Sequence, residues 1–198
     1  DAFVREITLR TAAGASYTLY LGSSPSYGAT HFRLANQEET YLTGGLTSWV
    51  ASVAPASWVD TAYLSVPQTE LQRLVVSNGL GEFTLVRDAE GQWVLEDLAE
   101  GETMDSTVAG LLVSRATALN LLRPLGRAEQ PDYGLAAPQA TVTLETASEA
   151  LTLRVGSQGV DGSYIVKSSG SEYYVRVSEY AVKDLVEKGR EALLKTGE

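Results

Sequence analysis

The chain has 198 residues, a formal net charge of -10 and 44% hydrophobic residues, which is enough for one or two domains with a buried core. An acidic chain repels nucleic-acid phosphates and anionic lipid headgroups, so we expect no nucleic-acid partner and no direct membrane insertion. The chain has no cysteine, which excludes disulfides, thiolate nucleophiles and thiolate metal ligands.

The two ends of the chain carry no recognisable targeting signal. No stretch approaches the ~20 apolar residues of a membrane span, and no secretory signal is visible. The only methionine is Met104, so we interpret Asp1 as a trimmed or processed start. Any targeting or anchoring segment would then lie outside this sequence.

The first forty residues show the period-two alternation of half-buried strands. Residues 46–54 (LTSWVASVA), which follow two glycines and precede Pro55, predict a helix. Before this helix the alternation predicts two β-hairpins, whose strands are residues 4–10, 16–22, 30–34 and 39–43.

The middle of the chain predicts a strand, a hairpin and a helix. Residues 71–77 form the strand, and residues 81–96 form a hairpin whose turn ends in a left-handed glycine, Gly91. A helix capped by Asp105 or Ser106 should run to about Leu122. Its predicted apolar stripe, which should face the hairpin through Leu112 and Leu119, comprises Val108, Leu111, Leu112, Leu119 and Leu122.

The opening pattern returns in the last third of the chain. TVTLE echoes EITLR, LTLRVG echoes YTLYLG and EYYVR echoes ETYLT, at a spacing of about 133 to 136 residues. We interpret this as an internal duplication. The final helix of the second copy is predicted from about Ser178 to Lys195.

These elements predict an α+β fold of antiparallel, hairpin-built sheets, each backed by a helix. The predicted organisation is a first strand-hairpin-helix copy (1–62), a middle β-hairpin-helix unit (63–127) and a second strand-hairpin-helix copy (131–198). They form either one compact body or two closely packed subdomains.

The order of these phrases resembles a bacterial family, domain of unknown function 4340. The resemblance rests on LTLRVG with the hairpin GSYIVKSSGSEYYVRV, on the linker PDYGLAAPQATVTL, and on the middle unit with its hairpin and Trp93. It implies an extracytoplasmic bacterial protein, tethered to the membrane and associated with transport systems resembling the gliding-type ABC exporters. No catalytic residue is implied.

The sequence offers little for catalysis or for a cofactor. His31 is the only histidine, and we interpret it as a surface residue of a strand. The acidic turns at 88–91 and 160–163 lack the ligand spacing of a calcium loop, so no metal site is predicted. The glycine-rich GSQGVDG (156–162) leads into a strand without a P-loop lysine, so we interpret its glycines as joints of the chain. We therefore predict no catalytic, cofactor-binding or metal residue.

Aromatic residues are the one suggestive signal. Exposed tyrosines stack on sugars or anchor protein interfaces, although tyrosine is also common in ordinary strands. Trp49, Trp58 and Trp93 are interpreted as packing residues. The candidate interaction surface comprises Tyr20, Tyr27, His31 and Tyr173.

Three roles are compatible with these observations. The first is a non-catalytic extracytoplasmic binding or scaffolding module that takes a protein partner at the membrane. The second is a carbohydrate-binding or carbohydrate-active surface protein, which uses exposed tyrosines and carboxylates. The third is a structural spacer. A pocket with two carboxylates ~5 to 10 Å apart would favour a glycosidase, and an exposed apolar patch would favour an interface.

Overall fold

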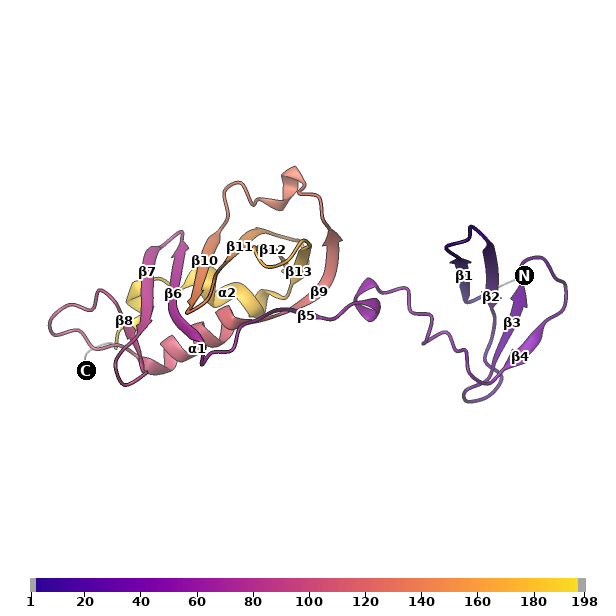
Figure 1. Ribbon diagram of the computed structural model, residues 1–198, viewed down its shortest axis with the longest axis horizontal. Coiled ribbons are helices and arrows are strands. Elements are labelled where there is room, and N and C mark those ends of the chain that lie inside the picture. Colours follow the sequence, from indigo (N-terminus) through magenta and orange to yellow (C-terminus); the bar gives the residue numbers. More distant parts are fainter. Residues whose placement is uncertain (1–2, 196–198) are drawn as a thin grey trace. The chain divides into compact units, whose positions relative to one another are not determined.

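The computed structural model describes residues 3–195, and the chain divides into two units, Asp1–Trp58 and Val59–Glu198 (Figure 1). Both sheets are antiparallel. The two α-helices of the described residues lie in the second unit. The fold is therefore mostly β with a smaller α part, and the predicted α+β class is right in this coarser sense.

The first unit is a four-stranded meander in the order β1-β2-β3-β4. Both predicted hairpins are confirmed, with Ile7 opposite Leu19 in one and His31 opposite Leu42 in the other. Leu21 and Thr30 are the only buried residues between positions 3 and 58. The elements are β1 (Arg5–Arg10), β2 (Ser16–Leu21), β3 (Thr30–Leu34), β4 (Tyr41–Thr43) and the 3-10 helix η1 (Pro55–Trp58).

The helix predicted over residues 46–54 is wrong. The segment forms turns, and a single 3-10 turn follows at η1. Nine residues rich in serine, threonine and valine are too short and too weak in helix propensity to form a helix without a packed face. Trp49 and Trp58 consequently do not pack in a core as predicted: they are 89% and 66% exposed.

The second unit is a nine-stranded sheet in the order β5-β9-β13-β12-β11-β10-β6-β7-β8. β6, from the predicted middle unit, pairs with β10, from the predicted second copy, so both belong to one sheet. The strands are β5 (Ala62–Ser65), β6 (Leu71–Asn78), β7 (Gly81–Arg87), β8 (Trp93–Leu95), β9 (Ala118–Gly126), β10 (Ala140–Thr146), β11 (Ala150–Gln158), β12 (Tyr164–Ser168) and β13 (Tyr174–Val177).

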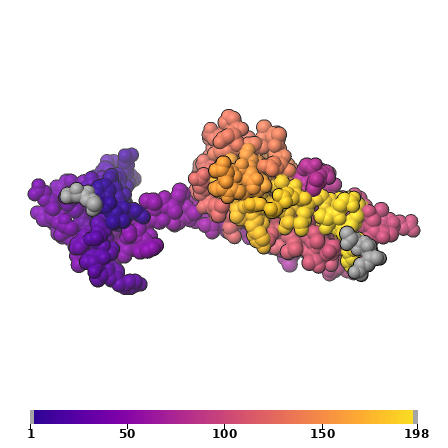
Figure 2. All heavy atoms as spheres, turned by 180° about the vertical axis from the view of Figure 1, so that it is seen from behind, coloured from indigo at the N-terminus to yellow at the C-terminus, as the bar shows by residue number. Residues whose placement is uncertain are grey.

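Two helices, α1 (Ser106–Thr117) and α2 (Glu179–Glu187), contact each other and pack on the sheet of the second unit (Figure 1). In Figure 2 the C-terminal segment, in yellow, lies over one side of this unit. The short helices η2 (Pro131–Tyr133) and η3 (Arg190–Leu193) complete the unit. The large core side chains with almost no exposure are Leu71, Leu74, Val76, Leu85, Leu112, Leu119, Leu135, Leu144, Leu153, Leu185 and Leu193.

The other two predicted helices exist but are shorter than predicted. Asp105 caps α1, because its carboxylate accepts hydrogen bonds from the backbone N–H groups of Thr107 and Val108. The chain then continues as strand β9 rather than as helix. α2 begins after Ser178 as predicted, but it ends before Gly189, where an added Cβ would lie 3.0 Å from the Cβ of Leu80.

The linker between β9 and β10 covers part of the sheet. Tyr133 and Leu135 pack with Ile165 and Tyr174 in a small apolar cluster. The backbone of Gly134 has a φ of 67°, a left-handed conformation that favours glycine. The segment Tyr133–Leu135 therefore has a structural role: it packs on the sheet, and we call it the clasp.

Arg190 fastens the C-terminal segment to the loop that precedes α1. Its guanidinium donates to Glu102 Oε1 at 3.0 Å and to Asp97 Oδ2 at 3.1 Å. The hydrogen bonds from Arg190, and one from the backbone N–H of Ala99, lower the pKa of Glu102 to about 2.

We expect the ion pair of Arg190 with Glu102 to make the free energy of unfolding depend on pH in the acid range. A carboxylate whose pKa falls on folding stabilises the folded state above its unfolded pKa of ~4.3, and this contribution disappears as pH falls toward 2. The denaturant concentration at the unfolding midpoint of the wild type should therefore decrease as the pH is lowered from 5 to 2. Arg190→Gln should flatten that part of the profile, whereas the exposed Arg123→Gln should leave it unchanged; equal profiles for all three proteins would contradict the assignment.

Candidate functional site

The first unit carries a pocket of about 480 Å³ on its sheet. Strands β2 and β3 supply most of it, together with the turn that follows β2. We call it the aromatic pocket. Its lining residues are Phe3, Tyr20, Gly22, Ser23, His31, Phe32, Arg33 and Thr40.

Strand register explains why these side chains meet. Tyr20 lies directly opposite Arg33, so both project from the same face of the sheet. His31 precedes Arg33 by two residues and shares that face. The ring of Phe3 lies 4.8 Å from that of Tyr20, and the guanidinium of Arg33 lies 5.7 Å from the Tyr20 ring centre.

The polar side chains of the aromatic pocket carry hydroxyl groups, one imidazole and one guanidinium. Ser23 Oγ lies 3.3 Å from His31 Nδ1. No carboxylate is among the lining residues named above. The pocket thus presents a ring, a cation and several hydrogen-bonding groups, which suits binding better than acid–base hydrolysis of a glycoside.

Many large apolar side chains of the first unit are exposed. Of the nineteen large hydrophobic residues exposed in the described chain, eleven belong to the first unit. We call these eleven the apolar surface: Phe3, Val4, Leu9, Tyr17, Tyr27, Tyr41, Leu42, Trp49, Val50, Val53 and Trp58.

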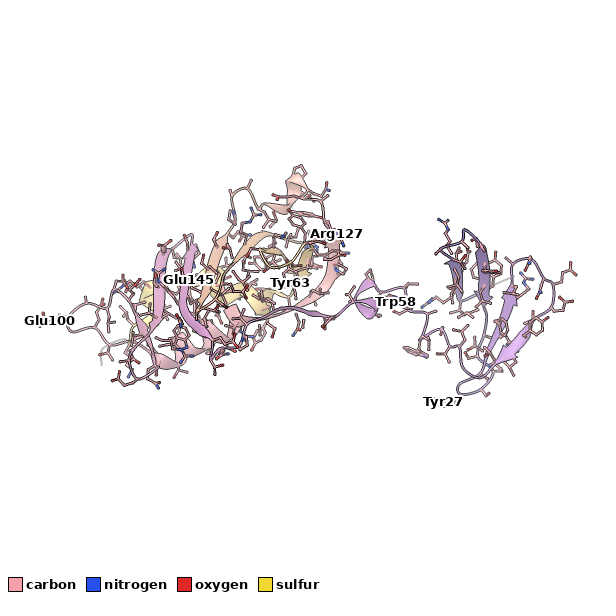
Figure 3. All side chains as sticks on the ribbon, in the orientation of Figure 1. Tyr27, Trp58, Tyr63, Glu100, Arg127 and Glu145 are labelled. Carbon is pink, nitrogen blue, oxygen red and sulfur yellow. The ribbon has the colours of Figure 1, made fainter. Side chains whose placement is uncertain are left out.

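The second unit has a smaller cleft, of about 300 Å³, beside β5, β9 and β13. Tyr63 and Arg127 both form hydrogen bonds with Tyr173. Figure 3 labels Tyr63 and Arg127. Arg127 donates to the Tyr173 hydroxyl at 2.8 Å and lies 4.9 Å from its ring centre. Tyr63 donates to the carbonyl of Tyr173 and accepts from the backbone N–H of Ser168, both at 2.8 Å. Burial raises the pKa of the Tyr63 phenol.

Tyr63 therefore has a structural role that a point substitution can measure. Tyr63→Phe leaves the N–H of Ser168 and the carbonyl of Tyr173 without this partner, which should lower the free energy of unfolding by about 1–2 kcal/mol. Urea denaturation measures the change. Tyr180→Phe is the control, since the Tyr180 hydroxyl, which belongs to an exposed side chain, has no hydrogen bond with any residue of 3–195. It should change stability by less than ~0.5 kcal/mol. Equal effects of the two substitutions would contradict this role.

The predicted interaction residues do not form one cluster. Tyr20 and His31 line the aromatic pocket, whereas Tyr27 is exposed in the connection between β2 and β3. Tyr173 belongs to the other unit and lines its cleft. Sequence reasoning missed Phe3 and Arg33, although the alternation that places Tyr20 on one face places Arg33 there as well.

The glycine-rich loop after β11 holds an internal hydrogen-bond network. Ser163 Oγ donates to Asp161 at 2.6 Å, and this bond lowers the pKa of the Asp161 carboxyl. Arg176 Nη1 donates to the same hydroxyl at 3.0 Å, and a Cβ at Gly159 would lie 2.5 Å from that nitrogen. The side chains of this loop are therefore hydrogen-bonded to one another and to Arg176, and Gly159 has no room for a larger side chain.

Within residues 3–195, no group of three or more histidine, cysteine, aspartate or glutamate side chains is arranged to hold a metal ion. In the same part of the chain, no helix is long and apolar enough to span a membrane.

Comparison with known proteins gives one match. The model of a family described as "Domain of unknown function (DUF4340)" matches residues 4–131, which is more than half of the chain and includes nearly the whole first unit. No curated protein and no solved structure matches.

Proposed function

We propose that this chain, which belongs to the DUF4340 family, is a non-catalytic binding module whose first unit receives a protein partner. The apolar surface carries this proposal, because it comprises eleven exposed large hydrophobic residues, whereas Leu21 is the one buried hydrophobic residue among residues 3–58. Monomeric proteins rarely expose large contiguous apolar patches, and such patches mark interaction sites. The aromatic pocket would receive a side chain of the partner.

The partner that we propose is a component of a membrane transport assembly outside the cytoplasm, with the chain tethered there by a segment beyond this sequence. The support is the resemblance set out above, together with a net charge of -10 that disfavours nucleic acid and anionic lipid as alternatives.

We also propose that β1–β4 and β10–β13 are copies of one ancestral meander. Their strand registers support this. Leu21 pairs with Phe32, and Phe32 with Tyr41. In the second set, at positions 134 residues later, Val155 pairs with Val166, and Val166 with Val175. The duplication would leave the first copy with a sheet like that of the second but without its covering helices.

A carbohydrate ligand is the second candidate function. The observation that favours it is the ring of Tyr20 in a pocket that also contains hydroxyl groups, the His31 imidazole and the Arg33 guanidinium, since sugars stack on rings and form hydrogen bonds with such groups. The lack of carboxylates among the lining residues counts against a glycosidase in this pocket.

Affinity capture from native membranes tests the proposal. The full-length protein, immobilised, should retain a transport component identified by mass spectrometry. Val53→Ser, in the apolar surface, should reduce that recovery severalfold. Val160→Ser makes the same change at an exposed valine of the second unit and should have no effect.

The result that would overturn the proposal is recovery of no transport component together with specific retention on a glycan array. Equal losses for Val53→Ser and Val160→Ser would also contradict the placement of the interface on the first unit.

A further inference from the structure

β1 forms an open edge of the first sheet. It pairs with β2 on one side and with no other strand of the described residues. The side chains of Glu6, Thr8, Leu9 and Arg10 are exposed along it. Open edges attract other strands and are normally blunted by proline, by inward-pointing charge or by a cover. In the described residues β1 has no proline and no adjacent strand on its outer side, and Arg5 is its one partly buried charged residue.

We propose that β1 pairs antiparallel with β1 of a second copy of the chain, about a two-fold axis at Thr8. The pairing joins two four-stranded sheets into one of eight strands. It goes beyond the proposed function, because it concerns the edge of the sheet and holds whether or not the aromatic pocket receives a partner.

The second unit shows how such an edge is occupied. β10 has the place in its meander that β1 has in the first, and β6 pairs with it antiparallel. Two apolar pairs, Val142 with Val76 and Leu144 with Leu74, lie on the buried face of that ladder. On the opposite face, Glu145 pairs with Arg73 at 3.3 Å.

Two copies of β1 paired in this way would have the same two features, apolar pairs on one face and opposite charges on the other. With Thr8 opposite Thr8 of the second copy, Ile7 lies opposite Leu9 and Glu6 lies opposite Arg10. Each of these pairs occurs twice because the interface is two-fold symmetric. Apolar side chains then face apolar ones, and opposite charges face each other, as in the ladder of β6 and β10.

Charge selects this register and this occupant. A shift by one residue in one direction would place Arg5 opposite Arg10, a repulsive pair, and a shift by one residue in the other direction would remove the attractive pairs of Glu6 with Arg10. In the described residues neither Glu6 nor Arg10 makes an ion pair within the chain. Both are therefore available to a second copy.

A cysteine substitution tests the geometry directly, because the chain contains no cysteine of its own. In the 198-residue protein, Thr8→Cys places two thiols directly opposite each other across the two-fold axis, within the Cα separation of ~4.4–6.8 Å that a disulfide spans. Mild oxidation should therefore give a covalent dimer. Thr18→Cys is the control, because Thr18 pairs with Thr8 on β2 and would lie ~14 Å from its own symmetry mate across three strand spacings.

Charge reversal tests the register. Glu6→Arg and Arg10→Glu each turn two attractive pairs into repulsive ones, which should weaken dimerisation of the cysteine-free protein roughly tenfold or more in sedimentation equilibrium. The double variant Glu6→Arg/Arg10→Glu restores opposite charges and should recover the wild-type dissociation constant. This recovery separates a register effect from misfolding.

A monomeric wild-type protein at millimolar concentration would overturn the proposal. So would equal cross-linking of Thr8→Cys and Thr18→Cys, or a double variant no better than the singles. Cross-linking of Thr8→Cys to a different protein, with no homodimer, would also overturn the proposal, because the occupant of the β1 edge would then be another protein.

Discussion

Replacing Gly156 with alanine should lower the free energy of unfolding by about 3 kcal/mol, one of the largest effects of any single methyl group in this chain. Gly156 lies in β11 beneath the clasp of Tyr133 and Leu135. An added Cβ would lie 2.1 Å from the carbonyl oxygen of Tyr133 and 3.0 Å from Cδ2 of Leu135. The nearest clashing atom belongs to the backbone of Tyr133, so the added methyl group can be accommodated only if the clasp moves away from the sheet.

Gly110→Ala is the matched control for this substitution. Gly110 is exposed in α1, and an added Cβ there has no atom within 4 Å. Alanine in a helix should raise stability by about 0.5–1 kcal/mol. Urea denaturation of both variants measures the difference, and a neutral Gly156→Ala would mean that the clasp does not pack on β11.

Leu112→Ala should lower the free energy of unfolding by about 3 kcal/mol, because it creates a cavity at a fully buried position of α1, a helix that contacts α2 and the sheet. The loss should be visible in the helical circular-dichroism signal, since both α-helices of the described chain belong to the second unit.

The adjacent Leu111→Ala is the control for Leu112→Ala. Leu111 is 49% exposed, whereas Leu112 is 0% exposed, so the same truncation at position 111 should cost less than ~1 kcal/mol. A similar loss at both positions would mean that α1 is rotated from the orientation described.

Strand prediction from the sequence succeeded wherever alternation was local. Both hairpins of the first unit, the hairpin of β7 and β8, and the left-handed Gly91 were predicted. Each rests on side-chain alternation and turn residues, which act within about ten residues of each other.

The helices show where local patterns fail. Leu119 and Leu122 fit a helical stripe, but Leu119 and Leu121 also fit strand alternation, and pairing of β9 with β5 and β13 decides between them. Leu111 and Leu122 were expected to be buried and are exposed. The buried face of α1 instead contains Ala109, Leu112, Val113 and Ala116.

The candidate site was predicted only in fragments. Alternation placed Tyr20 and His31 on strands, and register between β2 and β3 then brought them into one pocket with Arg33. Register is a long-range property, which single-strand patterns do not determine. The exposure of Trp49 and Trp58 was missed because it depends on the failure of residues 46–54 to form a helix.

The central claim is that the first unit, and not the second, is the surface that contacts a protein partner. In-cell photo-cross-linking tests it most directly, with benzoylphenylalanine replacing either Trp49 or Tyr180 in the full-length protein. Both side chains are exposed aromatics, 89% and 72% respectively, one in each unit. We predict a covalent adduct with a membrane transport component from position 49 and none from position 180. Adducts from position 180 alone, or from neither position, would contradict the account.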